Sequence, residues 1–183
     1  MCGQSERRVA HRTVRTHAAA VAERYGALVE PRHVGLFQNG DEMRNRSAPP
    51  ASVTPVLSYP DVAAAVGWLT HTFGFVEHVR IGDHRAQLGF GDGALIVADA
   101  GQGRRAPTSD GVTHSVMVRV DDVDDHHQRA SAAGAHVVSS PETHMFGERQ
   151  YVALDLAGHQ WIFTQSVADV SPETWGGTTA TPW

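Results

Sequence analysis

The chain has 183 residues, of which 41% are hydrophobic and 19% are charged, and its net charge is −5. This composition indicates a globular domain, and the acidic balance argues against general nucleic-acid binding, which needs a basic surface. No apolar run approaches the roughly 20 residues of a membrane span, and no apolar segment follows the polar N-terminus as it would in a signal peptide. The single cysteine, Cys2, excludes an internal disulfide. We therefore expect a cytoplasmic protein that binds neither nucleic acid nor membrane.

Residues 1–52 are interpreted as an N-terminal extension and linker. The stretch around His17–Arg24 is rich in alanine and favours a helix, and a Pro/Ser-rich linker at Ser47–Ser52 marks the boundary of the next domain. The sequence Gly-Asp-Glu just before Met43 would be encoded by purine-rich codons that resemble a ribosome-binding site. This suggests the hypothesis that Met43 is the natural start and that residues 1–42 are a misassigned leader.

An internal repeat follows the linker. Residues 54–61 match residues 114–121 at an offset of 60, each a predicted strand that ends at an aspartate. A predicted helix follows in each half, over 61–73 and over 122–133, with an aspartate to cap its start. Gly74 and Gly134, again 60 apart, suit the left-handed residue that ends a helix.

Three further strands are predicted in each half, separated by glycine-rich or proline-containing turns. They cover residues 75–81, 85–90 and 94–98 in the first half, and 136–139, 150–155 and 160–165 in the second. The predicted fold class is therefore α+β, with two β-α-β-β-β modules forming a curved mixed sheet. The modules occupy residues 53–167, and residues 168–183 form a C-terminal tail.

The paired modules resemble the glyoxalase/bleomycin-resistance/extradiol-dioxygenase family, also called the vicinal oxygen chelate superfamily. The most telling segments are Phe146-Gly147-Glu148-Arg149-Gln150-Tyr151 and Asp155-Leu156-Ala157-Gly158-His159-Gln160-Trp161. They look like the aromatic-Gly-acid-Arg and Asp-Pro-x-Gly-His/Asn signatures of the phosphonate-operon-type branch, with Leu156 in place of the usual proline. The resemblance covers about residues 53–167 and implies a fold, whereas function depends on the site.

The resemblance also implies where a metal would bind in members that hold one. The matching positions are Thr54, Ile96, His114 and Ile162, and only His114 is a good ligand. A divalent cation needs three or more converging donors, so two isoleucines at carboxylate positions predict that no metal or other cofactor binds. The other histidines are scattered along the chain, and His144 and His159 are the candidates to approach His114.

Without a metal, the same concave face becomes an apolar pocket for a small molecule. Strand alternation predicts that Val56, Ser58, Ala94, Ala98, Val116, Val118, Gln160 and Thr164 share this face, while Trp161 and Phe163 lie under the helices. His114 and Gln160 are expected to orient the ligand. Met145, Phe146 and Tyr151 are candidates either for an aromatic rim or for ordinary packing. The predicted ligand-binding residues are Thr54, Val56, Ile96, His114, Val116, Gln160, Ile162, Phe146 and Tyr151.

Three functions are compatible with these residues. The leading hypothesis is metal-independent binding of a hydrophobic or aromatic compound, similar to proteins that sequester antibiotics. The resemblance implies a homodimer whose paired modules complete two pockets. The second is a metal-dependent lyase, isomerase or dioxygenase that uses His114 with noncanonical ligands. The third is a structural or regulatory module.

Overall fold

The computed structural model describes residues 46–101, 103–108 and 111–180. The helix expected near His17–Arg24 and the start proposed at Met43 lie outside the described residues. The elements in chain order are β1 (Val56–Tyr59), α2 (Val62–Phe73), β2 (Val76–Ile81), β3 (Arg85–Phe90), β4 (Gly93–Asp99), β5 (Ser115–Arg119), α3 (Val123–Ala132), β6 (His136–Thr143), β7 (Glu148–Leu154), β8 (Gln160–Ser166) and the 3₁₀ helix η1 (Pro172–Trp175). None of the helices within these ranges is long and apolar enough to cross a membrane.

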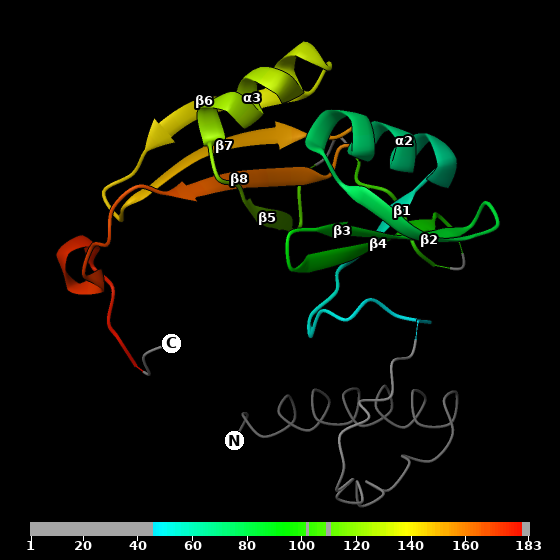
Figure 1. Ribbon diagram of the computed structural model, residues 1–183, viewed down its shortest axis with the longest axis horizontal. Coiled ribbons are helices and arrows are strands. Elements are labelled where there is room, and N and C mark those ends of the chain that lie inside the picture. Colours follow the sequence, from blue (N-terminus) through cyan, green and yellow to red (C-terminus); the bar gives the residue numbers. More distant parts are fainter. Residues whose placement is uncertain (1–45, 102, 109–110, 181–183) are drawn as a thin grey trace, which may run out of the picture. The chain divides into compact units, whose positions relative to one another are not determined.

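Each module forms its own four-stranded mixed sheet, with the orders β1-β4-β3-β2 and β5-β8-β7-β6. The first strand pairs in parallel with the last strand of its module, and the remaining neighbours are antiparallel. Within each module the helix covers one face of the sheet (Figure 1). The predicted fold class of two β-α-β-β-β modules is confirmed.

The helix boundaries are set by the residues that the sequence indicates. Asp61 and Asp122 cap the two helices by accepting the backbone N–H groups of Ala64 and Asp125, each at 2.9 Å. Gly74 and Gly134 adopt left-handed conformations at the far ends, with φ of 81° and 90°. The caps are thus 61 residues apart while the glycines are 60 apart, because the second helical segment is one residue shorter.

Strand β6 is longer than expected and runs through Pro141, where a turn was predicted. Proline is tolerated there because β6 is the edge strand of its sheet and needs no donor on its outer side. The register with β7 also shifts between Ser139 and Glu142, so Pro141 sits within an irregularity of the ladder.

The two modules share one apolar core between their helices and sheets. Phe73, at the end of α2, lies against Trp161 and Phe163 of β8, with ring centroids 5.6 and 4.8 Å apart. In α3 the buried residues are Val123, His126 and Ala130. Of the two adjacent histidines in this helix, His126 is buried and His127 is only half-buried. The aromatic residues of β8 face this core as expected, because both are fully buried.

Candidate functional site

The face of the second sheet that points away from α3 combines an apolar row with a polar row. Cross-strand pairing sets Met117, Ile162 and Val152 side by side on β5, β8 and β7. Met117 is 58% exposed and the other two are half-buried. The neighbouring row on the same face is polar and consists of Arg119, Thr164 and Gln150. The face therefore offers an open apolar surface beside fixed hydrogen-bonding groups, which is typical of small-molecule sites.

Glu148, at the start of β7, organises the polar end of this face. Its carboxylate accepts hydrogen bonds from the hydroxyls of Thr164 and Ser166, each at 2.5 Å, and lies 3.4 Å from an Arg119 nitrogen. Arg119 also donates to the Ser166 hydroxyl. Partial burial alone would raise the pKa of Glu148, but the two hydroxyls and the Arg119 charge hold it below its ordinary value. Glu148 is therefore ionised at neutral pH, and its charge is paired with that of Arg119.

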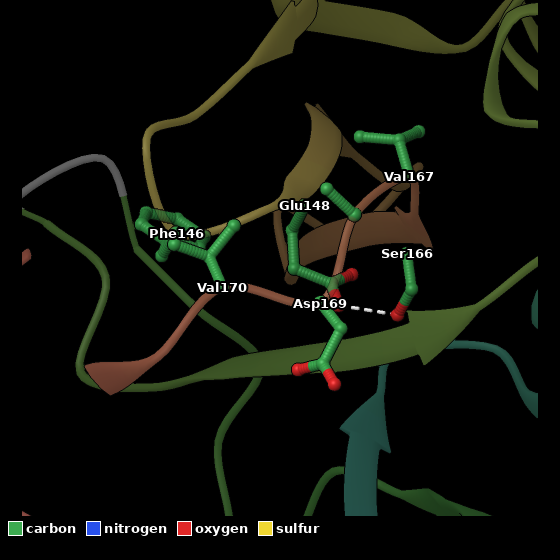
Figure 2. A pocket seen from close by; sticks show the side chains of 7 residues that line it. Phe146, Glu148, Ser166, Val167, Asp169 and Val170 are labelled. Carbon is green, nitrogen blue, oxygen red and sulfur yellow. Dashed lines mark hydrogen bonds between the residues drawn. The ribbon is translucent and has the colours of Figure 1, made fainter. Parts of the chain in front are cut away.

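A cavity of about 530 Å³ adjoins this polar end (Figure 2). One side of it is lined by Phe146, whose ring stacks on His144 with centroids 4.9 Å apart and meets Trp175 edge-on at 6.1 Å. Figure 2 shows Phe146 beside Val170, and the carboxylate of Glu148 hydrogen-bonded to Ser166. The complete lining is Phe146, Glu148, Ser166, Val167, Ala168, Asp169 and Val170. An aromatic wall and carboxylates thus border one space.

The residues predicted to bind ligand in the first module lie on or near its sheet face away from α2. Val56 of β1 pairs with Ile96 of β4, and the two side chains share that face. Val56 is 48% exposed, whereas Ile96 is only 4% exposed. Thr54 precedes β1, is half-buried, and donates its hydroxyl to the Ala51 carbonyl at 3.4 Å.

In the second module the face predicted for β5 is wrong. Val116 pairs with Trp161 and packs against the shared core, and Val118 is buried there too. Met117 and Arg119 occupy the open face instead. The prediction failed because it aligned the two modules at an offset of 60, which matches the glycines. The second helical segment is one residue shorter, so this offset aligns β5 with β1 one residue out of register. A shift of one residue exchanges the two faces of a strand.

His114 is not on the open face. It lies just before β5, is exposed, and its Nδ1 is 3.2 Å from the Thr113 hydroxyl. Its ring lies 5.9 Å from that of His159, which is buried and donates from Nε2 to the Ser58 carbonyl at 2.9 Å. His144 stacks on Phe146, so the three histidines considered together do not converge.

The remaining predicted residues divide between the face and the core. Gln160 and Ile162 lie on β8 with their side chains on the open face, and Phe146 lines the cavity. Tyr151 is fully buried, stacks on Phe163 at 5.0 Å, and contacts His126 through its hydroxyl at 2.7 Å. Of the two alternatives for Tyr151, the structure favours packing.

The Asp155–His159 segment joins the two modules. Asp155 is 6% exposed and accepts the Tyr59 hydroxyl of β1 at 2.6 Å and the Trp161 indole N–H at 3.0 Å. Its other oxygen accepts the backbone N–H groups of Ala157 and His159. Burial, reinforced by Asp155, raises the pKa of Tyr59, so the hydroxyl stays protonated as a donor. The Asp155–His159 part of the family signature therefore has a structural role here, because it holds β1 against the second module.

The four family metal positions do not fit a divalent cation. Ile96 and Ile162 provide no donor atom. Thr54 and His114 lie on different modules, where the Thr54 hydroxyl bonds to the Ala51 carbonyl and His114 Nδ1 lies beside the Thr113 hydroxyl. Within the described residues, no group of three or more His, Cys, Asp or Glu side chains is placed to hold a metal ion. No reaction step is therefore derived through a metal.

The sequence did not single out Met117, Arg119 or Glu148 as face residues. The sequence pointed to Glu148 only as a member of the Phe146–Tyr151 signature. Strand alternation predicted Met117 and Arg119 on the opposite face of β5. The aspartate caps gave the correct spacing, since aligning Asp61 with Asp122 places Val56 opposite Met117.

Comparison with known proteins agrees with this architecture. The model of the Glyoxalase/Bleomycin resistance protein/Dioxygenase superfamily matches residues 52–163. The uncharacterized protein Rv0887c of Mycobacterium tuberculosis is 32% identical over 145 residues, which are 73% of this chain and 84% of that protein. The structure is similar to TioX from Micromonospora sp. ML1, with 37% identity, a TM-score of 0.55, and 63% of this chain and 98% of that chain covered.

A glyoxalase/bleomycin resistance protein/dioxygenase from Nocardioides shares the fold at 21% identity, with a TM-score of 0.55 and coverage of 68% and 89% of the two chains. The family model spans more than half of the chain, and the mycobacterial relative is covered over most of its length. The chain therefore belongs to the glyoxalase/bleomycin resistance protein/dioxygenase superfamily.

Proposed function

We propose that this protein binds a hydrophobic or aromatic small molecule, without a metal, on the open face of its second sheet. The observation that carries the proposal is the apolar row of Met117, Ile162 and Val152 beside the hydrogen-bonded Glu148 network. The apolar row contributes binding through burial, at about 25 cal/mol per Å² of apolar surface removed from water. The polar row fixes the orientation of the ligand.

The cavity next to Glu148 extends the same site. Its aromatic wall suits a flat ring, and the carboxylate suits a donor group on that ring. Sequestration of such a compound, an antibiotic for example, is the physiological role that fits a binding face of this kind. We also propose that the protein works as a homodimer in which a second copy helps to enclose this face.

The alternative of a metal-dependent lyase, isomerase or dioxygenase has less support. His114 is exposed and lies outside the open face, and isoleucines occupy the two positions where family members with a metal carry carboxylates. A site of this composition favours binding over metal-assisted chemistry.

Titration with Nile red, an uncharged aromatic probe whose fluorescence rises in apolar sites, tests the proposal. We expect saturable binding by the wild type and at least tenfold weaker binding by Met117→Lys, because a charge then interrupts the apolar row. Val76→Lys is the matched control, since Val76 is similarly exposed, at 54%, but lies in the first sheet. Equal binding by all three proteins, or no binding by the wild type, would contradict the proposed site.

A further inference from the structure

The first sheet has a face equivalent to the proposed site, but the chain itself covers it. We name residues 46–53 the strap. In Figure 1 this segment, in cyan, passes on the side of β3 and β4 opposite α2. The side-chain amide of Gln87 on β3 donates to the backbone carbonyl of Ser47 at 2.9 Å, which ties the strap to the sheet. Pro49 and Ala51 of the strap are half-buried.

Equivalent positions in the two sheets differ in exposure where the strap lies. In the first sheet Val56, Ile96 and Gln87 form the row that corresponds to Met117, Ile162 and Val152 in the second. Ile96 and Gln87 are each 4% exposed, while their counterparts Ile162 and Val152 are only half-buried. The helix lies on the other face, so it does not account for this burial.

We propose that the strap is an intramolecular occupant that covers the Ile96 and Gln87 part of the first sheet's face and leaves the second sheet's face open. The strap supplies a backbone carbonyl to Gln87, and its half-buried Pro49 and Ala51 are the side chains that we assign to the apolar row. A carbonyl-bearing apolar ligand has the same chemistry, so the strap and such a ligand compete for the first face. The proposal that the strap covers the first face does not depend on the proposed function. The conclusion that each chain keeps one ligand-binding face open does rest on the proposed function.

The strap is suited to reversible release. Pro49 and Pro50 lack N–H donors and cannot form a regular ladder with the sheet, and the Gln87 bond to Ser47 joins groups 40 residues apart in the chain. A segment that lies outside the strand ladder can open locally without unfolding the domain.

Thiol reactivity tests this proposal in the full chain with Cys2→Ser as background. Ile96→Cys and Ile162→Cys place a thiol at matched positions on β4 and β8, and 5,5′-dithiobis(2-nitrobenzoate) reports how fast each thiol reacts. We expect Gln87→Ala to speed the reaction of Ile96→Cys at least fivefold and to leave Ile162→Cys unchanged. A second variant, Pro49→Gly with Pro50→Gly, loosens the strap without altering the sheet and is expected to have the same selective effect.

Ile162→Cys also serves as the folding control, because general loosening of the domain would speed both thiols. An unchanged Ile96→Cys rate in both strap variants, or an equal acceleration of both thiols by the double glycine variant, would overturn the proposal. These measurements contain no ligand. Failure of the dye titration would therefore contradict the proposed function and leave the strap intact, and the reverse also holds.

Discussion

At the scale of single residues, His126 of α3 bonds to the first module through Nε2 and to β7 of its own module through Nδ1. Phe73 offers a carbonyl at 3.1 Å, so Nε2 is the donor, and Nδ1 at 2.7 Å then accepts from the Tyr151 hydroxyl. The side chain is 3% exposed. Burial lowers the pKa of His126, and the Phe73 hydrogen bond only partly offsets that effect.

This arrangement predicts a pH-dependent stability. Because the folded-state pKa lies below the unfolded value of about 6.5, the unfolded chain binds a proton that the folded protein does not. Stability is therefore complete above that pH and is lost as the pH falls below it, by at most about 1.4 kcal/mol per pH unit for this group. Urea unfolding of the wild type and of His126→Gln between pH 7.5 and 5 measures the effect.

The glutamine keeps one donor and one acceptor but does not titrate, so the variant is expected to have a shallower pH dependence. His71→Gln, a change at an exposed position of α2, is the control and should retain the wild-type slope. Identical slopes for wild type and His126→Gln would show that His126 does not carry the effect.

At the scale of elements, the turn before β7 depends on Gly147. Its carbonyl accepts hydrogen bonds from the backbone N–H groups of Val167 and Ala168. These bonds hold the segment after β8, which lines the cavity. Gly147 has φ of 85°, and a Cβ there would lie 2.2 Å from the Ala168 carbonyl oxygen. Both the backbone conformation and the close approach therefore require glycine.

A matched pair of substitutions separates these two requirements. Gly134→Ala introduces a side chain at φ of 90° with no heavy atom within 4 Å, and should cost about 1 kcal/mol of unfolding free energy. Gly147→Ala adds the collision with Ala168 and should cost about 2 kcal/mol more, because the backbone must move. Urea unfolding measures both losses, and equal losses would contradict the importance of the close approach.

At the scale of the whole molecule, the open face leaves apolar side chains in water. Met117 is 58% exposed on this face, and Ile162 and Val152 beside it are only half-buried. Soluble monomers rarely expose large contiguous apolar patches, and a stable dimer buries roughly 800 Å² on each partner. These exposed positions are why a second copy is the partner we propose.

Sedimentation equilibrium is expected to give about twice the 19.7 kDa chain mass at micromolar concentration. Met117→Lys should shift the equilibrium toward the single chain, since a charge at the open face opposes burial, whereas Val76→Lys should not. A single-chain mass for the wild type at every concentration would rule out the dimer.

Much of the fold could be predicted because the signals are local. Asp61 and Asp122 cap helices through N–H groups three residues away, and the left-handed glycines end them with equally short contacts. Alternation along β8 placed Trp161 and Phe163 in the core, as the structure confirms. The internal repeat then predicted two modules with the same order of strands and helix, because the repeat can be read directly from the sequence.

The site was only partly readable from local patterns. The 61-residue spacing of Asp61 and Asp122 places Met117 on the open face, whereas the 60-residue spacing of the glycines places Val116 there, since a shift of one residue reverses a strand. The choice of His126 over His127 depends on where Tyr151 and the Phe73 carbonyl lie. The sequence by itself thus determined the elements and their pairing into modules. Only the tertiary structure decided which face stays open, because the strap reaches Gln87 from 40 residues away in the chain.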